Sequence, residues 1–523
     1  MKKNIFFINI KEKILILFLV LFSILINQYY GNRGVFPVDS FAHFDTGFRV
    51  LNGEYPFKDY WIVSGPLLDY IQAAFFYVFG INWQSYILHA SVFNAILTVS
   101  TFLILRKFNV KTYYCFFYSI LFSILAYPSS GTPFVDHHSA FFSLLGIYTL
   151  IAAIKTEKKI FWILLPILLG LAFLSKQVPA SYVIISIFLF LLYFLALEKN
   201  YYWLKYFLIS SFSFIFLLLI LGKVQGISFL SFLEQYIFYP QTIGDERYSE
   251  FQITFRGIIS HFKFIYIFLI PLFYINIKKA LFDKKYYKEK NFFYFIILIS
   301  FSFSLILHQV LTKNQTFIFF LIPLLSAFSH VYLKRIKLNN ITKVLFISVC
   351  LFATLKYHLR FNEDRKFHEL NYVNFNLSSD AKKIDNRFLG LKWITPEYKN
   401  NPEKEINFIN KIKLQLVKDK RNKMLISNYS FFSTILNEKL FSPSRWYLSD
   451  GTDYPLKGNK HFSSYKRFLI DIIKKNNINV IYIIHPQEKS IIFNYIDENC
   501  FTEVKIFKSL KSYELKNCNE ING

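Results

Sequence analysis

The chain has 523 residues, of which 54% are hydrophobic, 20% aromatic and only 18% charged. A soluble protein of this length would need far more charged surface, so the composition excludes an ordinary soluble fold and favours membrane spans. The formal net charge is +26, from 60 basic and 34 acidic residues. Many lysines fall in short loops between apolar runs, where they set membrane topology, so we expect no nucleic-acid partner.

The N-terminus, MKKNIFFINIKEK followed by an apolar run, is built like a signal peptide. No small-residue cleavage site follows FLVLFSILINQYY, so we expect this run to be a retained first span.

Eleven apolar runs in all are predicted to span the membrane. They lie at about 13–30, 84–105, 113–127, 138–154, 160–175, 180–197, 203–222, 261–278, 292–309, 316–332 and 342–358. The basic clusters, such as RKFNVK, KTEKK and LKRIKLNNITK, then all fall on one side, as the positive-inside bias requires. The sequence therefore predicts an α-helical polytopic membrane protein with about 11 transmembrane helices and a cytoplasmic N-terminus, with outer loops at 31–83 and 223–260.

The segment 67–82, LLDYIQAAFFYVFGIN, is apolar but short, and it contains Asp69 and Gln72. We interpret it as an amphipathic helix at the outer interface rather than as a twelfth span.

From about residue 359 the composition changes, since charged residues rise and the apolar runs shorten to strand length: NKMLISN, NVIYIIH and TEVKIFKSL. A helical pattern, SSYKRFLIDIIKKNN, lies between them. We therefore predict two domains, a transmembrane domain over 1–358 and a soluble extracytoplasmic α/β domain over 359–523.

Two of the four cysteines, Cys500 and Cys518, flank a predicted pair of strands. A disulfide between them is compatible with the oxidising side of a membrane. Cys115 and Cys350 fall inside predicted spans, where we expect them to act as apolar side chains.

Ionisable residues gather at the predicted outer ends of several spans, and such groups at a membrane boundary tend to mark a site. If 38–50 is a helix, Asp39 and His43 share one face while Asp45 points elsewhere. Each residue alone also has a structural explanation, as a solvated loop acid, a helix cap or a snorkelling lysine. The candidates are Asp39, His43, Asp45, Asp59, Asp136, His137, His138, Lys176, Gln177, Arg247, Arg256 and Lys313, with Glu54, Asp69 and His308 nearby.

The order of features in 36–105 resembles the GT-C superfamily of membrane glycosyltransferases. An aspartate follows the first span, and RVLNGEYPFKDYW and SGPLLDYIQAAFFYVFG come next, as in bacterial protein mannosyltransferase-like, aminoarabinose-transferase-like and galacturonosyltransferase-like members. The segment GLAFLSKQVPA (170–180) is similar to their G-x-x-x-K-Q segment. The resemblance covers roughly the first 200 residues. The chain departs from the pattern at Asp39-Ser40, where many members have two adjacent acids, and this puts a second-acid or metal-binding role in doubt.

The resemblance implies transfer of a sugar from a polyprenyl-phosphate donor to a lipid, glycan or protein acceptor. Asp39 would be the general base that activates the acceptor hydroxyl, and His43 would orient it or bind sugar. Cations would stabilise the departing phosphate, with arginine favoured for its planar fork. For this role we expect Arg247, Arg256, Lys176 and Lys313. The expected place is the outer face of the bacterial cytoplasmic membrane.

Several alternatives remain open at this point. Asp136 with His137 and His138 would offer ligands for a divalent cation, although two adjacent histidines on a helix do not readily share one ion. The loop SPSRWYLSDGTDY (442–454) would stack on sugar faces, or its Trp446 would be a core residue. A transporter or flippase of lipid-linked sugars is the main alternative function, and an O-antigen polymerase or ligase is a further one.

Overall fold

The computed structural model describes residues 9–197, 201–249, 254–312, 318–334, 340–448, 450–507, 509–516 and 518. By the density of its internal contacts the chain divides into two units. Unit 1 comprises Met1–Asn32, Ile87–Ile215 and Gln252–Asn371, and unit 2 comprises Arg33–Tyr86, Phe216–Phe251 and Tyr372–Gly523. The domain boundary at residue 358 stays a prediction.

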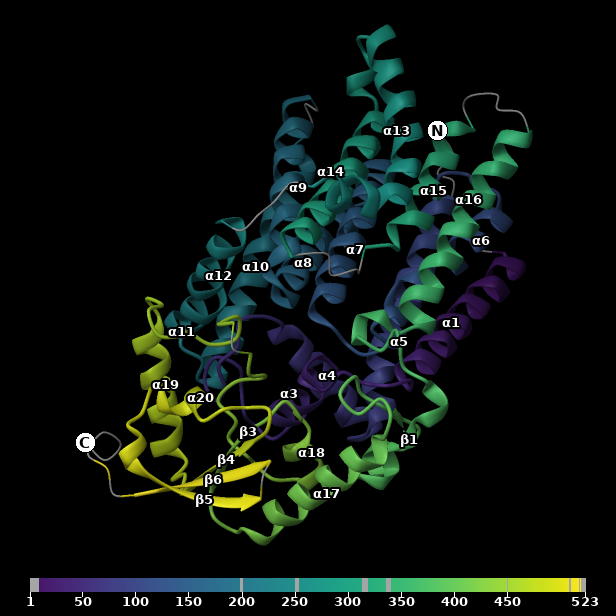
Figure 1. Ribbon diagram of the computed structural model, residues 1–523. Helices are drawn as coiled ribbons and strands as arrows, with labels where there is room; N and C mark the ends of the chain where they lie inside the picture. Colours follow the sequence, from purple (N-terminus) through teal and green to yellow (C-terminus); the bar gives the residue numbers. More distant parts are fainter. Residues whose placement is uncertain are drawn as a thin grey trace. The chain divides into compact units, whose positions relative to one another are not determined.

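Unit 1 is a bundle of long apolar helices, whose labels appear in Figure 1. In the described part of the chain a helix lies at each of the eleven predicted span positions. These helices are α1 (Ile10–Gly31), α5 (Trp83–Lys107), α6 (Thr112–Leu125), α7 (Val135–Thr156), α8 (Lys159–Ser175), α9 (Gln177–Leu197), α10 (Tyr202–Gln225), α13 (His261–Phe282), α14 (Lys290–Leu311), α15 (Leu321–Leu333) and α16 (Asn340–His358).

Eight helices among the described residues are long and apolar enough to cross a membrane. The other three predicted spans are shorter, since α6, α8 and α15 have 14, 17 and 13 residues. At 1.5 Å per residue these helices cover roughly 20 to 25 Å of a hydrocarbon core about 30 Å thick. The polytopic α-helical fold is confirmed, and three of its predicted crossings are incomplete as helices.

Ion pairs join helix ends at the lysine-rich end of unit 1. Arg106 Nη2 at the end of α5 lies 2.6 Å from Glu12 Oε1 at the start of α1. Lys290 Nζ at the start of α14 lies 2.6 Å from Glu157 Oε1 just after α7. At this end of unit 1 the start of one helix therefore lies beside the end of another, as expected for helices that run alternately up and down with their basic clusters on one side.

At the opposite end of unit 1, the buried guanidinium of Arg365 binds the turn between α6 and α7. Arg365, only 1% exposed, donates to the carbonyl oxygens of Pro128, Ser129 and Ser130 at 2.8, 3.2 and 2.9 Å. These carbonyls belong to the turn between α6 and α7, so the guanidinium satisfies backbone acceptors that the helices leave unpaired.

The most enclosed span of unit 1 is α7, which packs against α8, α9 and α14. Gly146 lets α8 approach closely, because a Cβ added there would lie 3.1 Å from Leu169. In contrast, α10 is mostly exposed, with Leu208, Phe212 and Ile215 on its surface. A helix that is apolar and exposed in this way is suited to face lipid.

Unit 2 combines short helices with a mixed sheet (Figure 1). Its helices are α2 (Pro37–Ser40), α3 (Ala42–Leu51), α4 (Pro66–Phe79), α11 (Phe229–Leu233), α12 (Tyr239–Ser249), α17 (Pro402–Lys418), α18 (Phe432–Leu436), α19 (Phe462–Lys475) and α20 (Ser490–Phe493). Its strands are β1 (Ser379–Asp380), β2 (Lys392–Trp393), β3 (Lys423–Ile426), β4 (Val480–Ile484), β5 (Phe501–Phe507) and β6 (Leu510–Leu515).

The larger sheet has the strand order β3-β4-β6-β5. β3 and β4 are parallel, whereas β4 with β6 and β6 with β5 are antiparallel. The three predicted strands and the predicted helix of the C-terminal part are therefore confirmed. A disulfide joins Cys500 and Cys518 across the β5–β6 hairpin, which answers a question that the sequence left open.

The hydrophobic core of unit 2 draws on all three of its chain segments. Trp61 of the first outer loop and Tyr239 of α12 are buried together with Met424 and Ile481 of the sheet. Residues 33–86 and the C-terminal α/β part therefore contribute to one shared core.

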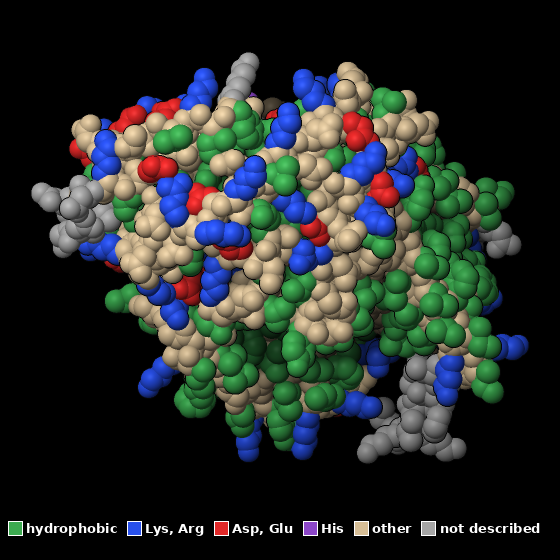
Figure 2. All heavy atoms as spheres, turned by 90° about the horizontal axis from the view of Figure 1, so that it is seen from below, with side chains coloured by type: hydrophobic (Ala, Val, Ile, Leu, Met, Phe, Trp, Pro, Cys, Tyr) green, Lys and Arg blue, Asp and Glu red, His purple; other side chains and the backbone are tan. Residues whose placement is uncertain are grey.

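Acidic and basic side chains lie among one another over much of the face shown in Figure 2, and hydrophobic side chains gather on other parts of it. Unit 2 contains exposed ion pairs of this kind, such as Arg421 with Glu514 at 2.9 Å and Lys489 with Glu498 at 2.5 Å. Exposed pairs contribute at most about 1 kcal/mol each, so their main effect is on solubility.

α4 turns its polar residues inward. Asp69 and Gln72 are fully buried, whereas Tyr77, Val78 and Phe79 are 81%, 66% and 53% exposed. A helix with polar groups inside and apolar groups outside is suited to a membrane interface, which supports the predicted position of 67–82.

Candidate functional site

The predicted base, Asp39, lies in the first turn of α2 and is partly buried. The condition of a continuous helix over 38–50 is not met, because the helix breaks at Phe41 between α2 and α3. The Phe41 ring is fully buried against aromatic rings, with centroids 5.2 Å from Trp83 and 4.8 Å from Phe431. Packing of this one side chain therefore outweighs the regular helix, and Asp39 and His43 do not share a helical face.

Asp69 is the centre of a buried polar cluster in unit 2. Its carboxylate accepts hydrogen bonds from His43 Nδ1 at 2.8 Å, Tyr60 Oη at 2.9 Å, Arg445 Nη2 at 2.8 Å and the Thr46 hydroxyl. Burial alone would raise the pKa of Asp69, but the Arg445 guanidinium and the His43 and Thr46 hydrogen bonds outweigh burial and lower it. The carboxylate is therefore ionised, and both of its oxygens accept hydrogen bonds.

His43 is neutral in this cluster. Burial, and then the positive charge of Arg445, lower the pKa of His43 to about 4, against the opposing effect of Asp69. Because the Asp69 carboxylate only accepts, His43 Nδ1 carries the proton and Nε2 keeps its lone pair. Asp69 thus fixes the tautomer and the orientation of His43, a role that the sequence had assigned to no residue.

Asp45 lies on α3 beside a small cavity lined by five serines and Arg445. Asp45 is 6% exposed, its Oδ1 has no hydrogen-bond partner, and burial raises its pKa to about 6 despite the nearby Arg49 charge. A buried carboxyl that titrates near neutral pH beside a polar cavity is characteristic of functional sites.

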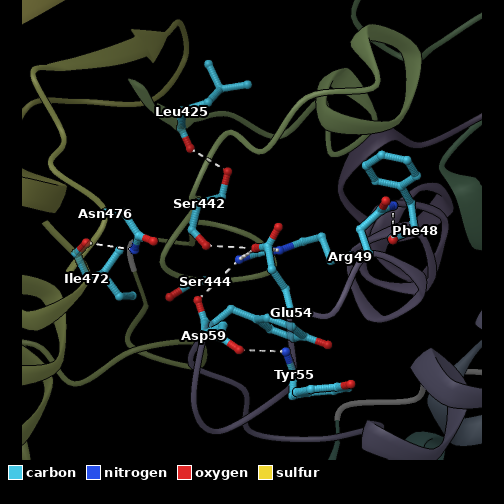
Figure 3. A network of polar contacts seen from close by, with 12 residues as sticks. Phe48, Arg49, Glu54, Tyr55, Asp59, Leu425, Ser442, Ser444, Ile472 and Asn476 are labelled. Carbon is cyan, nitrogen blue, oxygen red and sulfur yellow. Dashed lines mark hydrogen bonds and ion pairs between the residues drawn. The ribbon is translucent and has the colours of Figure 1, made fainter. Parts of the chain in front are cut away.

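Arg49 connects the first outer loop to the C-terminal segment, as Figure 3 shows. It donates to Glu54 Oε2 at 2.9 Å and to the carbonyl oxygens of Ser442 and Asp59 at 2.8 and 3.2 Å. The Asp59 carboxylate accepts from the Tyr55 backbone N–H at 2.9 Å (Figure 3). Its other oxygen accepts from Lys475 Nζ at 2.9 Å. Asp59, predicted to bind substrate, thus has protein partners for both carboxylate oxygens.

A second acid, Asp453, lies within electrostatic reach of Asp39. Its pKa is raised well above the usual value, first by burial and then by the negative charges of Asp450 and Asp39. Its Oδ2 accepts the Leu448 N–H at 3.0 Å, and its Oδ1 has no hydrogen-bond partner. Burial therefore favours the protonated form of this carboxyl, and its Oδ1 is available to a ligand.

Trp446 is only partly buried, so it is not a core residue. It lines a small cavity together with Trp61, Arg445 and Asp453. The Arg445 guanidinium lies 5.3 Å from the Trp446 ring centre.

The candidates in unit 1 form a separate cluster. Asp136 at the start of α7 accepts from Lys176 Nζ at 2.9 and 2.8 Å with its two oxygens, and His308 Nε2 lies 2.9 Å from Oδ1. Asp136 and His308 are buried, and the Lys176 side chain is 18% exposed. A buried triad at helix ends in a membrane protein is a functional-site candidate.

The neighbouring histidines bond elsewhere. His137 Nε2 lies 3.1 Å from Ser129 Oγ, and His138 Nε2 lies 3.0 Å from His89 Nε2. In this arrangement Asp136, His137 and His138 are not placed as ligands for one ion. Across the described residues, no three or more His, Cys, Asp and Glu side chains are placed to bind a metal.

The structure places the remaining candidates as follows. Gln177 begins α9 and is partly buried, and Arg256 is exposed before α13. Arg247 lies on α12, but its side chain is outside the described residues, as is the whole of Lys313. Their substrate-binding roles stay predictions.

Sequence reasoning missed Arg49, Arg445 and Asp453, and gave Asp69 no role. One available signal was Asp69 itself, because an acid within an apolar helix must find a partner for its charge. The sequence does not indicate which of the chain's 60 basic residues that partner is.

Comparison with known proteins adds one finding. Among curated proteins, none matches the chain. Residues 63–244 match the family described as dolichyl-phosphate-mannose-protein mannosyltransferase. The matched range includes Asp69, α4 and the bundle helices from α5 to α10. Together with the polytopic helical fold, this match supports the assignment of the chain to the GT-C superfamily of membrane glycosyltransferases.

Proposed function

We propose that the protein transfers a sugar from a polyprenyl-phosphate donor to a lipid, glycan or protein acceptor on the outer face of a bacterial cytoplasmic membrane. The family match supports a lipid-phosphate sugar donor in general. Asp39 lies on the short helix that precedes His43 in the chain and is within electrostatic reach of Tyr86 and Asp453, and this position carries the assignment of the catalytic residue.

Asp39 is the general base in this proposal. The acceptor hydroxyl oxygen forms a bond to the anomeric carbon while the bond from that carbon to the phosphate oxygen breaks. The proton of the hydroxyl goes to the Asp39 carboxylate, and polyprenyl phosphate leaves with the electron pair. Proton acceptance by a positioned carboxylate contributes about 10²- to 10⁴-fold in rate.

Unit 2 supplies three further groups for substrate. The Oδ1 of Asp453, which has no hydrogen-bond partner among the described residues, offers a polar contact for a sugar hydroxyl, and the partly buried Trp446 offers a ring face for stacking. The Nε of Arg445 is buried without a hydrogen-bond partner, so it has a donor left for a substrate oxygen. The cavity among these residues is only about 10 Å³, so its lining must move apart to admit a sugar ring.

The test uses the full chain in its own membrane. Deletion of the gene should remove one sugar from the envelope glycans in mass spectra, and the wild-type chain should restore it. The Asp39→Asn variant should transfer the sugar at least about 100-fold more slowly, since the amide cannot accept the proton although the side chain keeps its shape. Asp471→Asn, an isosteric change at an exposed acid of α19, is the matched control and should restore the sugar fully. Full activity of Asp39→Asn at wild-type membrane abundance would refute the assignment of the base.

Transport of lipid-linked sugars remains the second candidate, because the Asp136–Lys176–His308 triad is of the type that transporters use. A transporter should keep its activity in Asp39→Asn and lose it in Lys176→Met. A transferase should form a new glycosidic bond in detergent solution, where no compartments exist.

A further inference from the structure

A cavity of about 350 Å³ opens at the lysine-rich end of unit 1, and the proposed function makes no use of it. It lies between the start of α6, the end of α15 and the start of α16. Its volume falls within the range of about 300 to 1,000 Å³ that is typical of small-molecule sites.

The charges around this cavity have one sign. Lys111, Lys334 and Lys343 line it, and the lining residues that the structure describes include no aspartate or glutamate. Glu12 is an acid of this end of the bundle, but it is 2% exposed and pairs with Arg106 at 2.6 Å. The cavity therefore has a positive potential that attracts anions.

Backbone groups add to this potential. α6 begins at Thr112, next to Lys111, and α16 begins at Asn340, three residues before Lys343. The first N–H groups of a helix lack intrahelical partners and bear partial positive charge, which suits phosphate. Lys334 Nζ donates to the Asn109 carbonyl at 3.2 Å, and this bond holds the third ammonium close to the same loop.

The rest of the lining is aromatic and apolar. Tyr113, Tyr114 and Phe346 line the cavity, and the Tyr114 ring packs on His330 with centroids 4.4 Å apart. On the adjoining turns of α16, Ile341 and Val344 are 77% and 63% exposed. An anion bound here would therefore have an apolar surface beside it.

Lysines that only set topology have no reason to converge on a cavity. Three lysines and the start of α6 do so here, at the end of a membrane bundle and next to exposed apolar residues. In an anionic phospholipid, the phosphate can pair with the lysines while the acyl chains cover the exposed apolar residues. We propose that this cavity binds the phosphate of an anionic phospholipid, with the acyl chains along α16.

The experiment measures binding of short-chain phosphatidylglycerol to the purified full-length protein in a neutral detergent, by microscale thermophoresis. Short-chain phosphatidylcholine and inorganic phosphate are the comparison ligands. The test variant replaces Lys111, Lys334 and Lys343 with glutamine. The matched control replaces Lys284, Lys285 and Lys288 with glutamine as well. These three lysines are exposed at the same end of the bundle and lie outside the cavity. A third variant places arginine at the three test positions and keeps the charge.

We expect phosphatidylglycerol to bind the wild-type chain, the control variant and the arginine variant with similar affinity. Each lysine near a bound anionic lipid contributes a factor of about 5 in affinity, so the test variant should bind on the order of 100-fold more weakly. Absence of phosphatidylglycerol binding would overturn the proposal. Equal losses in the test and control variants, or equal binding of phosphatidylcholine, would also overturn it, because either result denies a specific anion site. Competition by inorganic phosphate at the same affinity would assign the site to free phosphate and refute the lipid.

Discussion

The buried pair of Asp69 and Arg445 gives the sharpest prediction about stability. Asp69→Asn keeps the shape of the side chain but removes the charge that Arg445 faces at 2.8 Å. The two side chains are 0% and 3% exposed, so the unpaired guanidinium cannot be hydrated without disrupting unit 2. Breaking a buried ion pair by removing one partner costs about 3 to 5 kcal/mol.

The other hydrogen bonds act in the same direction. In the variant, one of the two carboxylate oxygens that accept from His43, Thr46 and Tyr60 becomes an NH₂ group. At least one of these donors then faces the NH₂ group, which is itself a donor, and loses its hydrogen bond. At roughly 2 to 4 °C per kcal/mol, the variant should unfold about 10 °C lower than the wild type. Tryptophan fluorescence of the full chain in detergent during heating measures this shift, with Asp471→Asn as the control.

A double-mutant cycle tests the cause of this effect. Arg445→Met removes the cation, and the remaining Asp69 charge should then be as costly as the unpaired arginine. If the two residues act as one pair, the double variant should lose no more stability than either single variant, which gives a coupling energy of about 3 kcal/mol or more. Additive losses would refute the reasoning, since they would show that each residue contributes on its own.

Three further predictions concern unit 2. Because the pKa of His43 is lowered in the folded protein, the unfolded chain binds a proton first as the pH decreases. The free energy of unfolding should therefore fall by about 3 kcal/mol between pH 6.5 and about pH 4. Unfolding temperatures measured against pH should show this slope in the wild type and a flatter slope in His43→Gln, and equal slopes would contradict the prediction. The raised pKa of Asp45 works in the opposite sense, because the folded state binds the proton first. Asp45→Asn should therefore be up to about 3 kcal/mol more stable at pH 7, with a gain that disappears near pH 4, and a destabilised variant at pH 7 would show that the charge is needed. Replacing Cys500 and Cys518 with serine opens a loop with a separation of 18 residues and should cost about 3 kcal/mol; reductant should lower the unfolding temperature of the wild type and leave the variant unchanged.

The positions of the helices along the chain followed from the sequence because each span carries its own signal. A long apolar run between basic clusters predicts a span and its direction without any knowledge of its neighbours. The strands β3 and β4 were predictable for the same reason, as short apolar runs within a charged segment.

The site depends on contacts that no local pattern contains. Asp69 and Arg445 are far apart in the sequence, and nothing in either neighbourhood names the other. The break at Phe41 also has a remote cause, since rings from distant segments surround that side chain. The candidates Asp39, His43 and Asp45 were found because they stand together in one short loop.

The distance along the chain between the partners of Asp69 has a consequence for synthesis. Arg445 is made 376 residues after Asp69, and at about 5 to 20 residues per second this takes roughly 20 to 75 s. During that time the first outer loop has Asp69 and His43 without the cation that completes their cluster. Its acids must stay hydrated until the C-terminal segment arrives, so the loop acquires its final form only near the end of translation. A chain cut short before residue 445 should therefore retain its spans and remain open to proteases in the loop that bears Asp39.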